Sequence, residues 1–198
     1  MSILDVLQRR RSCRSYKADN VSSEAMMQIL EAGNYAPSGG NTKQTKIFSF
    51  ENPKLIASLE HLVEQAFSQM EIKENMYKSM KNSIVLSKKG HYHFAYQAPV
   101  LILCANKKCY PNSMADSAVI LENMMIAATA LELGTCYVNQ VHWLTSHPCI
   151  REFLKPFGLE EDEDVFGGIV LGHPKNMPQK QPKRKQNQII RITKEIIS

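Results

Sequence analysis

Apolar residues recur along this chain at two spacings, one typical of helices and the other of strands. Helical spacing predicts helices over four ranges: Ile3–Arg11, Ser23–Tyr35, Pro53 to about Met70, and Ala115–Leu133. Ser22 is the expected N-cap of the second helix. Ser146 is the expected N-cap of a further short helix that follows the His147-Pro148 pair.

Strands are predicted where apolar residues alternate with polar ones or form a short unbroken run: Lys46–Phe50, Pro99–Ala105, Cys136–Val138 and Phe166–Leu171. The run Pro99–Ala105 is nearly uniform, as expected of a strand covered on both faces. Residues 71–96 are polar and mixed, and we expect a helical excursion there. Helices alternate with a few strands, without tandem βαβ units, so the pattern predicts an α+β fold and a single domain over 1–198.

Two apolar segments need more cover than one compact chain readily supplies. The helix over 115–133, which Gly134 is expected to end, is apolar nearly all round and therefore belongs in a core or a subunit interface. Gln188–Ile192 alternates apolar and polar residues after a polar stretch, which indicates pairing with something outside the main body. Residues 175–198 are therefore interpreted as a C-terminal extension.

Composition excludes several classes of protein. Hydrophobic residues make up 43% and charged residues 22% of the 198 residues, as in a globular chain rather than a disordered or fibrous one. The longest apolar run, Ala98–Ala105, is far shorter than the roughly 20 residues that a membrane-spanning helix needs. The N-terminus lacks the basic and then apolar layout of a secretory signal, so we expect a soluble protein that is not exported.

The charge and the cysteines narrow the classes further. The net charge of +5 can favour an anionic partner, but the chain has no recognisable nucleic-acid-binding module and no continuous basic helix, so nucleic-acid binding is disfavoured. The five cysteines include no Cys-x-x-Cys pair, and the histidines have no ligand spacing apart from His91-Tyr92-His93. We therefore expect no metal, no disulfide framework, and a reducing, cytoplasmic compartment.

Two segments carry groups that could bind a ligand. Arg10–Tyr16 places several cations and hydroxyls at the end of a helix, where a phosphate is a natural partner for guanidinium groups. Ala36–Thr42 offers backbone N–H and hydroxyl donors, but it has neither a Walker nor a G-x-G-x-x-G pattern. Taken alone, the first segment also fits a solvated basic face, the second an ordinary turn, and the basic run Lys183–Lys185 a solvated tail.

Taken in order along the chain, these segments resemble the FMN-dependent nitroreductase family. The resemblance covers about Ile3 to Arg184, and its most specific parts are Arg10–Tyr16, Ala36–Asn41 and Phe166–Pro174. It implies an α+β sandwich in which helices flank a central, mainly antiparallel sheet, built as an intertwined homodimer with FMN at the subunit interface. The apolar helix over 115–133 fits that arrangement, as does a C-terminal extension that in the family can cross to the partner subunit.

The resemblance also implies roles for individual residues. Arg10 and Ser12 would hold the FMN phosphate and ribityl chain, with Arg11 at the intervening position. Arg14 would approach the pyrimidine edge, where a cation stabilises the charge that collects on reduction. Backbone N–H groups of Asn139 and Gln140 would face flavin N5 and O4. The remaining cofactor-binding residues are loop positions that reach the flavin from the other subunit and a late phosphate-binding arginine: Pro37, Ser38, Gly39, Asn41, Lys43 and Arg184.

The implied activity is that of an oxidoreductase. NAD(P)H would pass hydride to flavin N5, and the flavin would pass electrons to a nitroaromatic, quinone or similar planar acceptor by a ping-pong mechanism, with no catalytic side chain required. The alternative is a flavin- or nucleotide-binding protein without turnover, in which Lys43 or residues 71–96 close the site. Lys43 and Thr45 replace the glutamine and tryptophan of the family's N-x-Q-P-W segment, so substrate preference is not carried over. Residues 71–96, with His91 and Tyr92, are placed near the substrate channel.

Overall fold

A sheet of four antiparallel strands lies at the centre of the residues that the structure describes. The structure is a computed structural model and describes residues 2–176 and 187–192. The strands lie side by side in the order β1-β2-β4-β3. In chain order they are β1 (Lys46–Phe50), β2 (Val100–Lys107), β3 (Gly134–Val138) and β4 (Glu163–Gly172). All the predicted strands are present, and β2, β3 and β4 extend beyond the predicted ranges.

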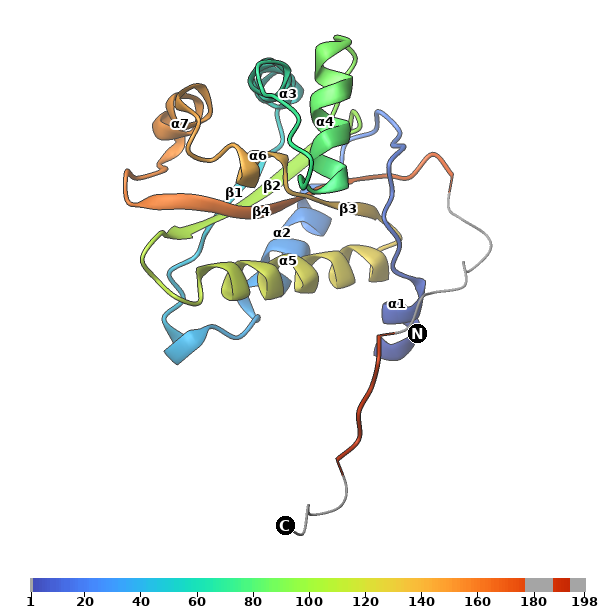
Figure 1. Cartoon of the computed structure of the whole chain (residues 1–198). Coiled ribbons are helices and arrows are strands. Elements are labelled where there is room, and N and C mark those ends of the chain that lie inside the picture. The colour runs from blue at the N-terminus through green and yellow to red at the C-terminus, as the bar shows by residue number, and fades with distance from the viewer. Residues whose placement is uncertain (1, 177–186, 193–198) are drawn as a thin grey trace.

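Helices cover both faces of this sheet (Figure 1). One face carries α3 (Pro53–Ser68), α4 (Lys78–Lys88), the short α6 (Gln140–Trp143) and α7 (Pro148–Leu154), and the other carries α2 (Ser23–Asn34) and α5 (Ser113–Ala130). The remaining elements are α1 (Ile3–Arg9) and two 3-10 turns, η1 (Gly39–Asn41) and η2 (Lys155–Phe157). The predicted α+β class, with an antiparallel sheet between layers of helices, is confirmed.

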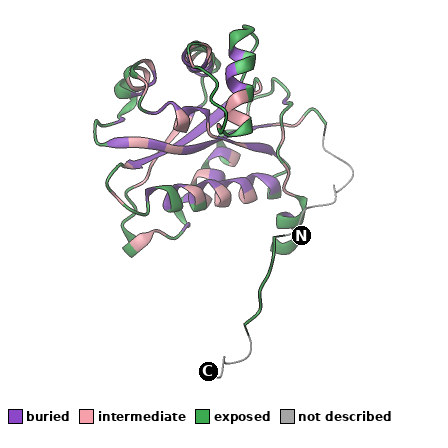
Figure 2. Cartoon of the chain, in the orientation of Figure 1, coloured by how far each residue is buried: buried purple, intermediate pink, exposed green. Residues whose placement is uncertain are grey.

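The β2 strand explains why its sequence is apolar throughout. Its odd-numbered residues 101–105 pack in one buried cluster with α3, α4 and α7, and its even-numbered residues 100–104 pack in another with α2 and α5. Since successive strand residues point to opposite faces, a strand between two helical layers needs apolar residues at every position. β2 is correspondingly buried at every position except its last residue (Figure 2).

The N-terminal segment after α1 runs along the β3 edge of the sheet. Ser12 forms an isolated parallel bridge with Thr135, where the Cys13 N–H donates to the Thr135 carbonyl at 2.7 Å. Tyr16 forms an antiparallel bridge with Pro174, just past the end of β4. These backbone bonds place the predicted arginine segment at one edge of the sheet.

The C-terminal end of α5 differs from the prediction. The helix ends at Ala130, and Glu132, with φ 60°, adopts the left-handed conformation that closes it. The N–H of Leu133 bonds to the Ala128 carbonyl at 2.8 Å and that of Glu132 to the Thr129 carbonyl at 3.2 Å, the two bonds of a Schellman motif. The prediction that Gly134 ends the helix is therefore wrong, because Gly134 is already the first residue of β3.

The predicted cap of α7 is also wrong. Its N-cap is His147, and no side chain caps the helix. Pro148 occupies the first turn, and because proline has no N–H, one of the donors that a cap would satisfy is missing. Ser146 lies one position too early to serve as the cap.

The described part of the C-terminal extension projects away from the sheet and passes α1 (Figure 1). Ile189, Ile190 and Ile192 are 84%, 73% and 87% exposed, and no strand forms in 187–192. Among the described residues, no helix combines the length and the apolar character needed to cross a bilayer.

Candidate functional site

The predicted phosphate-binding arginines lie where α1 meets the edge of the sheet. The Ser2–Asp5 capping box starts α1, and the helix ends at Arg9, where the non-helical backbone of Arg10 leads the chain toward β3. The Arg10 Nε lies 3.4 Å from Glu122 Oε1 on α5. The Arg11 guanidinium folds back on its own helix and donates to the carbonyls of Gln8 at 2.6 Å and Arg10 at 2.7 Å. Arg10 therefore already has an anionic partner within the chain, and Arg11 caps the helix end.

Ser12 and Arg14 present exposed donors beside β3. The Arg14 guanidinium carbon lies 5.9 Å from the centre of the Tyr96 ring, a cation–π contact. Burial raises the pKa of the neighbouring Cys136 thiol, and Arg14 and Ser12 oppose that rise. Thr135, the bridge partner of Ser12, has a buried hydroxyl with no hydrogen-bond partner among the described residues. Cationic and hydroxyl donors thus gather at this edge of the sheet, as an anionic group requires.

Asn139 and Gln140 follow directly on β3, at the start of α6. The Asn139 N–H donates to Oε1 of the Gln140 side chain at 3.0 Å, and Gln140 Nε2 donates to the Tyr92 hydroxyl at 2.8 Å. The Gln140 carboxamide is thus buried and engaged at both ends. The predicted pair therefore lies on a turn in which the Gln140 side chain holds the backbone N–H of Asn139.

The segment 91–97 links this turn to the arginines. Tyr92 contacts Gln140 at one end of the segment, and Tyr96 lies under Arg14 at the other. Carboxylates on α3 hold the segment through its backbone: Glu64 accepts from the Tyr92 N–H and Glu60 from the Ala95 N–H, each at 2.8 Å. Burial raises the pKa of the Glu60 carboxyl, and these backbone and His93 contacts oppose the rise. The predicted excursion thus ends inside the candidate site.

The glycine-rich loop is held by the first turn of α5. The Gly39 N–H lies 3.1 and 3.3 Å from the two carboxylate oxygens of Asp116, and the Tyr110 hydroxyl lies 3.0 Å from the Gly39 carbonyl. The same hydroxyl lies 3.1 Å from Asp116 Oδ2, so its one proton is shared between these two acceptors. A side chain at Gly39 would collide with Tyr110 and Asn112. Glycine is required here, because the loop approaches these side chains so closely.

Lys43 uses its side chain to brace the same loop. Its Nζ donates to the carbonyls of Asn34 at 3.0 Å and Ala36 at 2.6 Å, at the end of α2. Its N–H donates to Ser38 Oγ at 3.2 Å. Lys43 and Asn41 both have positive φ, 49° and 56°, which costs a residue with a side chain on the order of 1–2 kcal/mol. The charged hydrogen bonds of Lys43 offset that cost.

The structure does not bring the loop and the arginines together within one chain. The loop contacts Asp116 in the first turn of α5, whereas Arg9 lies 4.0 Å from Glu132, just past the last turn. A helix of 18 residues is about 27 Å long. The loop therefore lies at the first turn of α5 and α1 near its last turn (Figure 1), and Arg10 reaches Glu122 in the middle of the helix. Arg184 lies outside the described residues.

Sequence reasoning missed several residues that shape the site. Asp116 and Tyr110 anchor the loop, Ser83 and Glu64 hold the segment 91–97 in place, and Tyr96 of that segment contacts Arg14. No signal in the sequence marks them, because their contacts depend on how the elements pack and not on a local pattern. Within residues 2–176 and 187–192, no three histidine, cysteine, aspartate or glutamate side chains gather as a metal site would require.

These features define the class of the protein: an α+β sandwich with guanidinium and hydroxyl donors at one sheet edge and a glycine-rich loop at the far end of a central helix. The chain belongs to the nitroreductase family, because the sequence model of that family matches residues 7–173. The resemblance inferred from the motifs is thereby confirmed.

Individual proteins of this family resemble the chain over most of its length. A Bacteroides fragilis nitroreductase crystallised with bound FMN is 26% identical, has a TM-score of 0.85, and is matched over 98% of this chain and 100% of that one. The nitrobenzene nitroreductase of Ectopseudomonas oleovorans is 28% identical over 89% of each chain. An Archaeoglobus fulgidus protein assigned by name to the NADH dehydrogenases/NAD(P)H nitroreductases is 25% identical, with 87% of this chain and 86% of that protein covered.

Proposed function

We propose that this protein is an FMN-dependent oxidoreductase that takes electrons from NAD(P)H and passes them to a nitroaromatic, quinone or similar planar acceptor. The observation that carries this proposal is the set of donors from Arg10, Ser12 and Arg14 beside β3, in a nitroreductase-family chain. The FMN bound to the Bacteroides fragilis structure and the nicotinamide in the name of the Archaeoglobus fulgidus relative support it. FMN would accept hydride and pass electrons on, which no side chain of the protein can do.

The residues at the sheet edge fit the chemistry of FMN. Arg10 and Ser12 would bind the phosphate, which carries about −1.5 to −2 charges near neutral pH and accepts several hydrogen bonds. Arg10 would then leave Glu122 for the phosphate or contact both groups at once. Arg14, held against the Tyr96 ring, would place a fixed cation beside the pyrimidine edge of the flavin.

The second half of the site would come from a second copy of the chain. The loop with Pro37, Ser38, Gly39, Asn41 and Lys43 is held at the first turn of α5, whereas α1 lies near the last turn and Arg10 reaches only to Glu122 in the middle of the helix. Two copies related by a two-fold axis would place the loop of one beside the arginines of the other, twice over. We therefore propose an intertwined homodimer in which residues 1–198 of each copy form one FMN-binding domain.

Exposed apolar surface supports this assembly. Ile3 and Leu4 on α1 are 63% and 64% exposed, and Met114 and Val119 on α5 are also exposed. Side chains of this kind gain free energy when a partner covers them. The helix predicted to lie in a core or an interface thus has one face in the core and apolar residues left on another.

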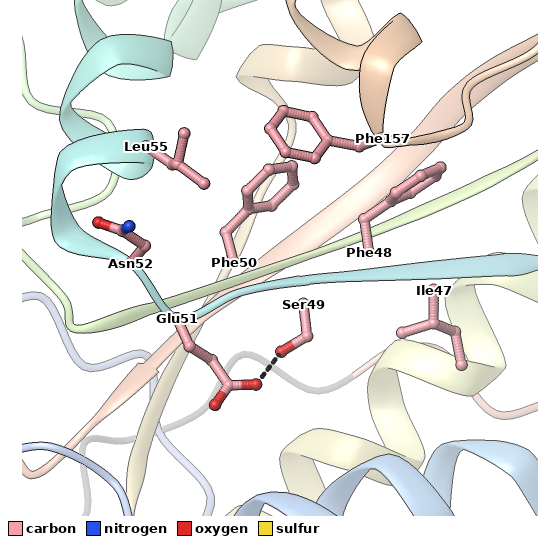
Figure 3. Close-up of a pocket in the computed structure, with 8 residues that line it drawn as sticks. All are labelled: Ile47, Phe48, Ser49, Phe50, Glu51, Asn52, Leu55 and Phe157. Atoms are coloured by element: carbon pink, nitrogen blue, oxygen red, sulfur yellow. Dashed lines mark hydrogen bonds between the residues drawn. The ribbon is translucent and has the colours of Figure 1, made fainter.

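The C-terminal extension has a matching place on a second copy. Among the described residues no strand pairs with the outer edge of β1, which has an apolar groove beside it. Phe48, Phe50 and Phe157 lie on one side of the strand and Ile47 on the other (Figure 3). An alternating segment such as Gln188–Ile192 can pair with such an edge and place side chains on both sides. We propose that the extension of each copy crosses to β1 of the other.

The reaction would be ping-pong. The chain has no dinucleotide-binding fingerprint, so the nicotinamide would stack over the flavin in the space that the acceptor uses afterwards. Initial rates over a grid of NAD(P)H and quinone concentrations would then give parallel double-reciprocal lines. Intersecting lines would contradict a shared space, and FMN binding without NAD(P)H oxidation would favour the alternative, a flavin-binding protein without turnover.

The state of the cysteines supports the expected compartment. All five carry free thiols, although three of them, Cys13, Cys109 and Cys149, are at least partly accessible. Free accessible thiols are typical of reducing compartments. We propose that the protein works in the cytoplasm.

A further inference from the structure

Three buried polar side chains form a chain of hydrogen bonds from the excursion to the end of β3. They are Ser83 on α4, Tyr92 in the loop before β2, and Gln140 on α6, and they are 1%, 9% and 7% exposed. The Ser83 and Tyr92 hydroxyl oxygens are 2.7 Å apart, and Gln140 Nε2 lies 2.8 Å from the Tyr92 oxygen. Asn139 completes the chain, because its N–H donates to Gln140 Oε1 at 3.0 Å.

The donor and acceptor at each step of this series of hydrogen bonds are fixed at its Ser83 end. The Ser83 hydroxyl lies 3.1 Å from the Ser79 carbonyl, which can only accept, so Ser83 donates there. Its oxygen then accepts from the Tyr92 hydroxyl, and the Tyr92 oxygen accepts from the Gln140 amide. Gln140 is left with its carbonyl oxygen toward the Asn139 N–H. A reversed carboxamide would point an NH₂ group at that N–H, so one carbonyl in α4 sets the orientation of an amide beyond Tyr92.

Tyr92 is itself held firmly. Its N–H donates to Glu64 Oε1 at 2.8 Å, and its ring meets the Phe67 ring edge-on with centroids 6.1 Å apart. Both partners belong to α3. The Tyr92 hydroxyl therefore has little freedom to move, so its hydrogen bonds can fix the position of the Gln140 carboxamide.

We propose that Tyr92, supported by Ser83, is a positioning residue for the Asn139–Gln140 turn and thereby for the flavin edge that this turn meets. The assignment rests on the proposed function, because the turn faces a flavin only if the chain binds FMN. Tyr92 touches neither the flavin nor the acceptor in this account; it fixes the turn by fixing the Gln140 carboxamide. A change in the position of Ser83 or Tyr92 in the excursion would then change the position of the flavin-facing turn.

Ser83→Ala tests the proposal at a distance, because an effect on Asn139 from this position must pass through Tyr92. Without its acceptor, the Tyr92 hydroxyl is free to donate to Gln140, and the carboxamide is no longer held in one orientation. We expect about tenfold faster hydrogen exchange of the Asn139 N–H in the FMN-free chain, and FMN binding weakened by about tenfold in a fluorescence titration. Tyr92→Phe removes the central link, and we expect the same changes.

Ser87→Ala is the matched control. Ser87 is also buried on α4, at 4% exposure, and its hydroxyl has no hydrogen-bond partner among the described residues. We expect Ser87→Ala to leave both measurements unchanged. Melting temperatures of all variants show that the chains compared are folded, and if Tyr92→Phe does not fold, Ser83→Ala still decides.

The possible failures are distinguishable. If the unsubstituted chain does not bind FMN, the proposed function fails, while the exchange measurement still tests the link from Ser83 to Asn139. If it binds FMN but Ser83→Ala changes neither exchange nor affinity, the positioning role is overturned. If exchange rises and FMN affinity stays the same, the hydrogen-bond chain is structural only, and the positioning role toward flavin is equally overturned.

Discussion

Arg10 is placed between an acid of its own chain and the phosphate that it is proposed to bind. Its Nε lies 3.4 Å from Glu122, and both side chains are partly accessible. A charge-assisted hydrogen bond contributes on the order of 1.5–3 kcal/mol, and a loss of 1.4 kcal/mol lowers affinity tenfold. We predict that Arg10→Ala weakens FMN binding at least tenfold without unfolding the protein, as measured by fluorescence titration.

The control for Arg10 is its partner. Glu122→Gln also breaks the ion pair but leaves the guanidinium for the phosphate, so we expect FMN binding unchanged or tighter. If both substitutions weaken binding equally, the ion pair and not the phosphate contact is responsible. Unchanged affinity in Arg10→Ala would contradict the assignment.

At the residue scale, sequence predicted the candidate donors but not what holds them. Arginines and a glycine-rich loop are visible because their chemistry resides in a few adjacent residues. Their supports are not visible, because Asp116 meets Gly39 across 77 positions and Tyr92 meets Gln140 across 48. The backbone bracing by Lys43 was equally hidden, since it depends on a left-handed turn that brings Nζ onto the end of α2.

At the scale of elements, the ends of β1, β2 and β4 are tied by a network of charges. Glu160 accepts from Lys46 at 2.8 Å and Lys107 at 2.7 Å, while Arg151 pairs with Asp164 at 3.2 Å. The hydrogen bonds from Lys107 and Lys46 lower the pKa of the Glu160 carboxyl from 4.5 to about 2. These ion pairs therefore tie together strands that are far apart in the sequence.

This network makes a stability prediction with a defined sign. Because the pKa of Glu160 is lower in the folded chain, its ion pairs stabilise the fold above about pH 4.5 and are lost as pH falls toward 2. We predict that Glu160→Gln lowers Tm by about 2 °C at neutral pH and that the difference shrinks across that window. The measurement is thermal unfolding at a series of pH values.

Glu161→Gln provides the comparison, because the Glu161 side chain forms no ion pair among the described residues. It should change Tm little at any pH. A difference between Glu160→Gln and the unsubstituted chain that stays constant down to pH 2 would contradict the role given to the ion pairs.

Most elements could be predicted from periodicity, whereas their ends could not. β1 matches the predicted Lys46–Phe50, and α2 and α3 differ by a residue or two, because burial on one face imposes a regular pattern. The end of α5 depends on Glu132 adopting a left-handed conformation that glycine usually supplies, and α7 begins without a side-chain cap. Such ends depend on the conformation of single residues and not on the apolar periodicity that reveals the helices.

At the scale of the whole molecule, the two halves of the proposed site need two chains. Within one chain the loop is held at the first turn of α5, while α1 lies near its last turn and Arg10 reaches Glu122 between them. The family resemblance already assigned the loop to the other subunit, a relation that no pattern within the chain reveals. Spacing along a sequence carries no information on distance across a subunit interface.

The C-terminal extension gives this arrangement a direct test. We predict that the full chain is a dimer and that deletion of residues 187–198 shifts it toward monomer with loss of FMN, because the β1 groove loses the apolar segment proposed to cover it. Light scattering coupled to size separation measures both mass and bound flavin. Arg191→Ala in the full chain, which keeps the isoleucines, should remain dimeric.

A stable monomer that retains one FMN per chain would contradict the two-chain site. A deletion variant that stays dimeric with full flavin would leave the dimer standing but exclude the crossing of the extension.

The central claim is that this chain binds FMN and reduces it with a nicotinamide, and anaerobic visible spectroscopy of the purified protein tests it most directly. We predict the spectrum of oxidised flavin at one FMN per chain, loss of that spectrum when NADH or NADPH is added without oxygen, and its return when a quinone follows. A chain that takes up no FMN, or whose bound flavin keeps its oxidised spectrum with both nicotinamides, would contradict the account.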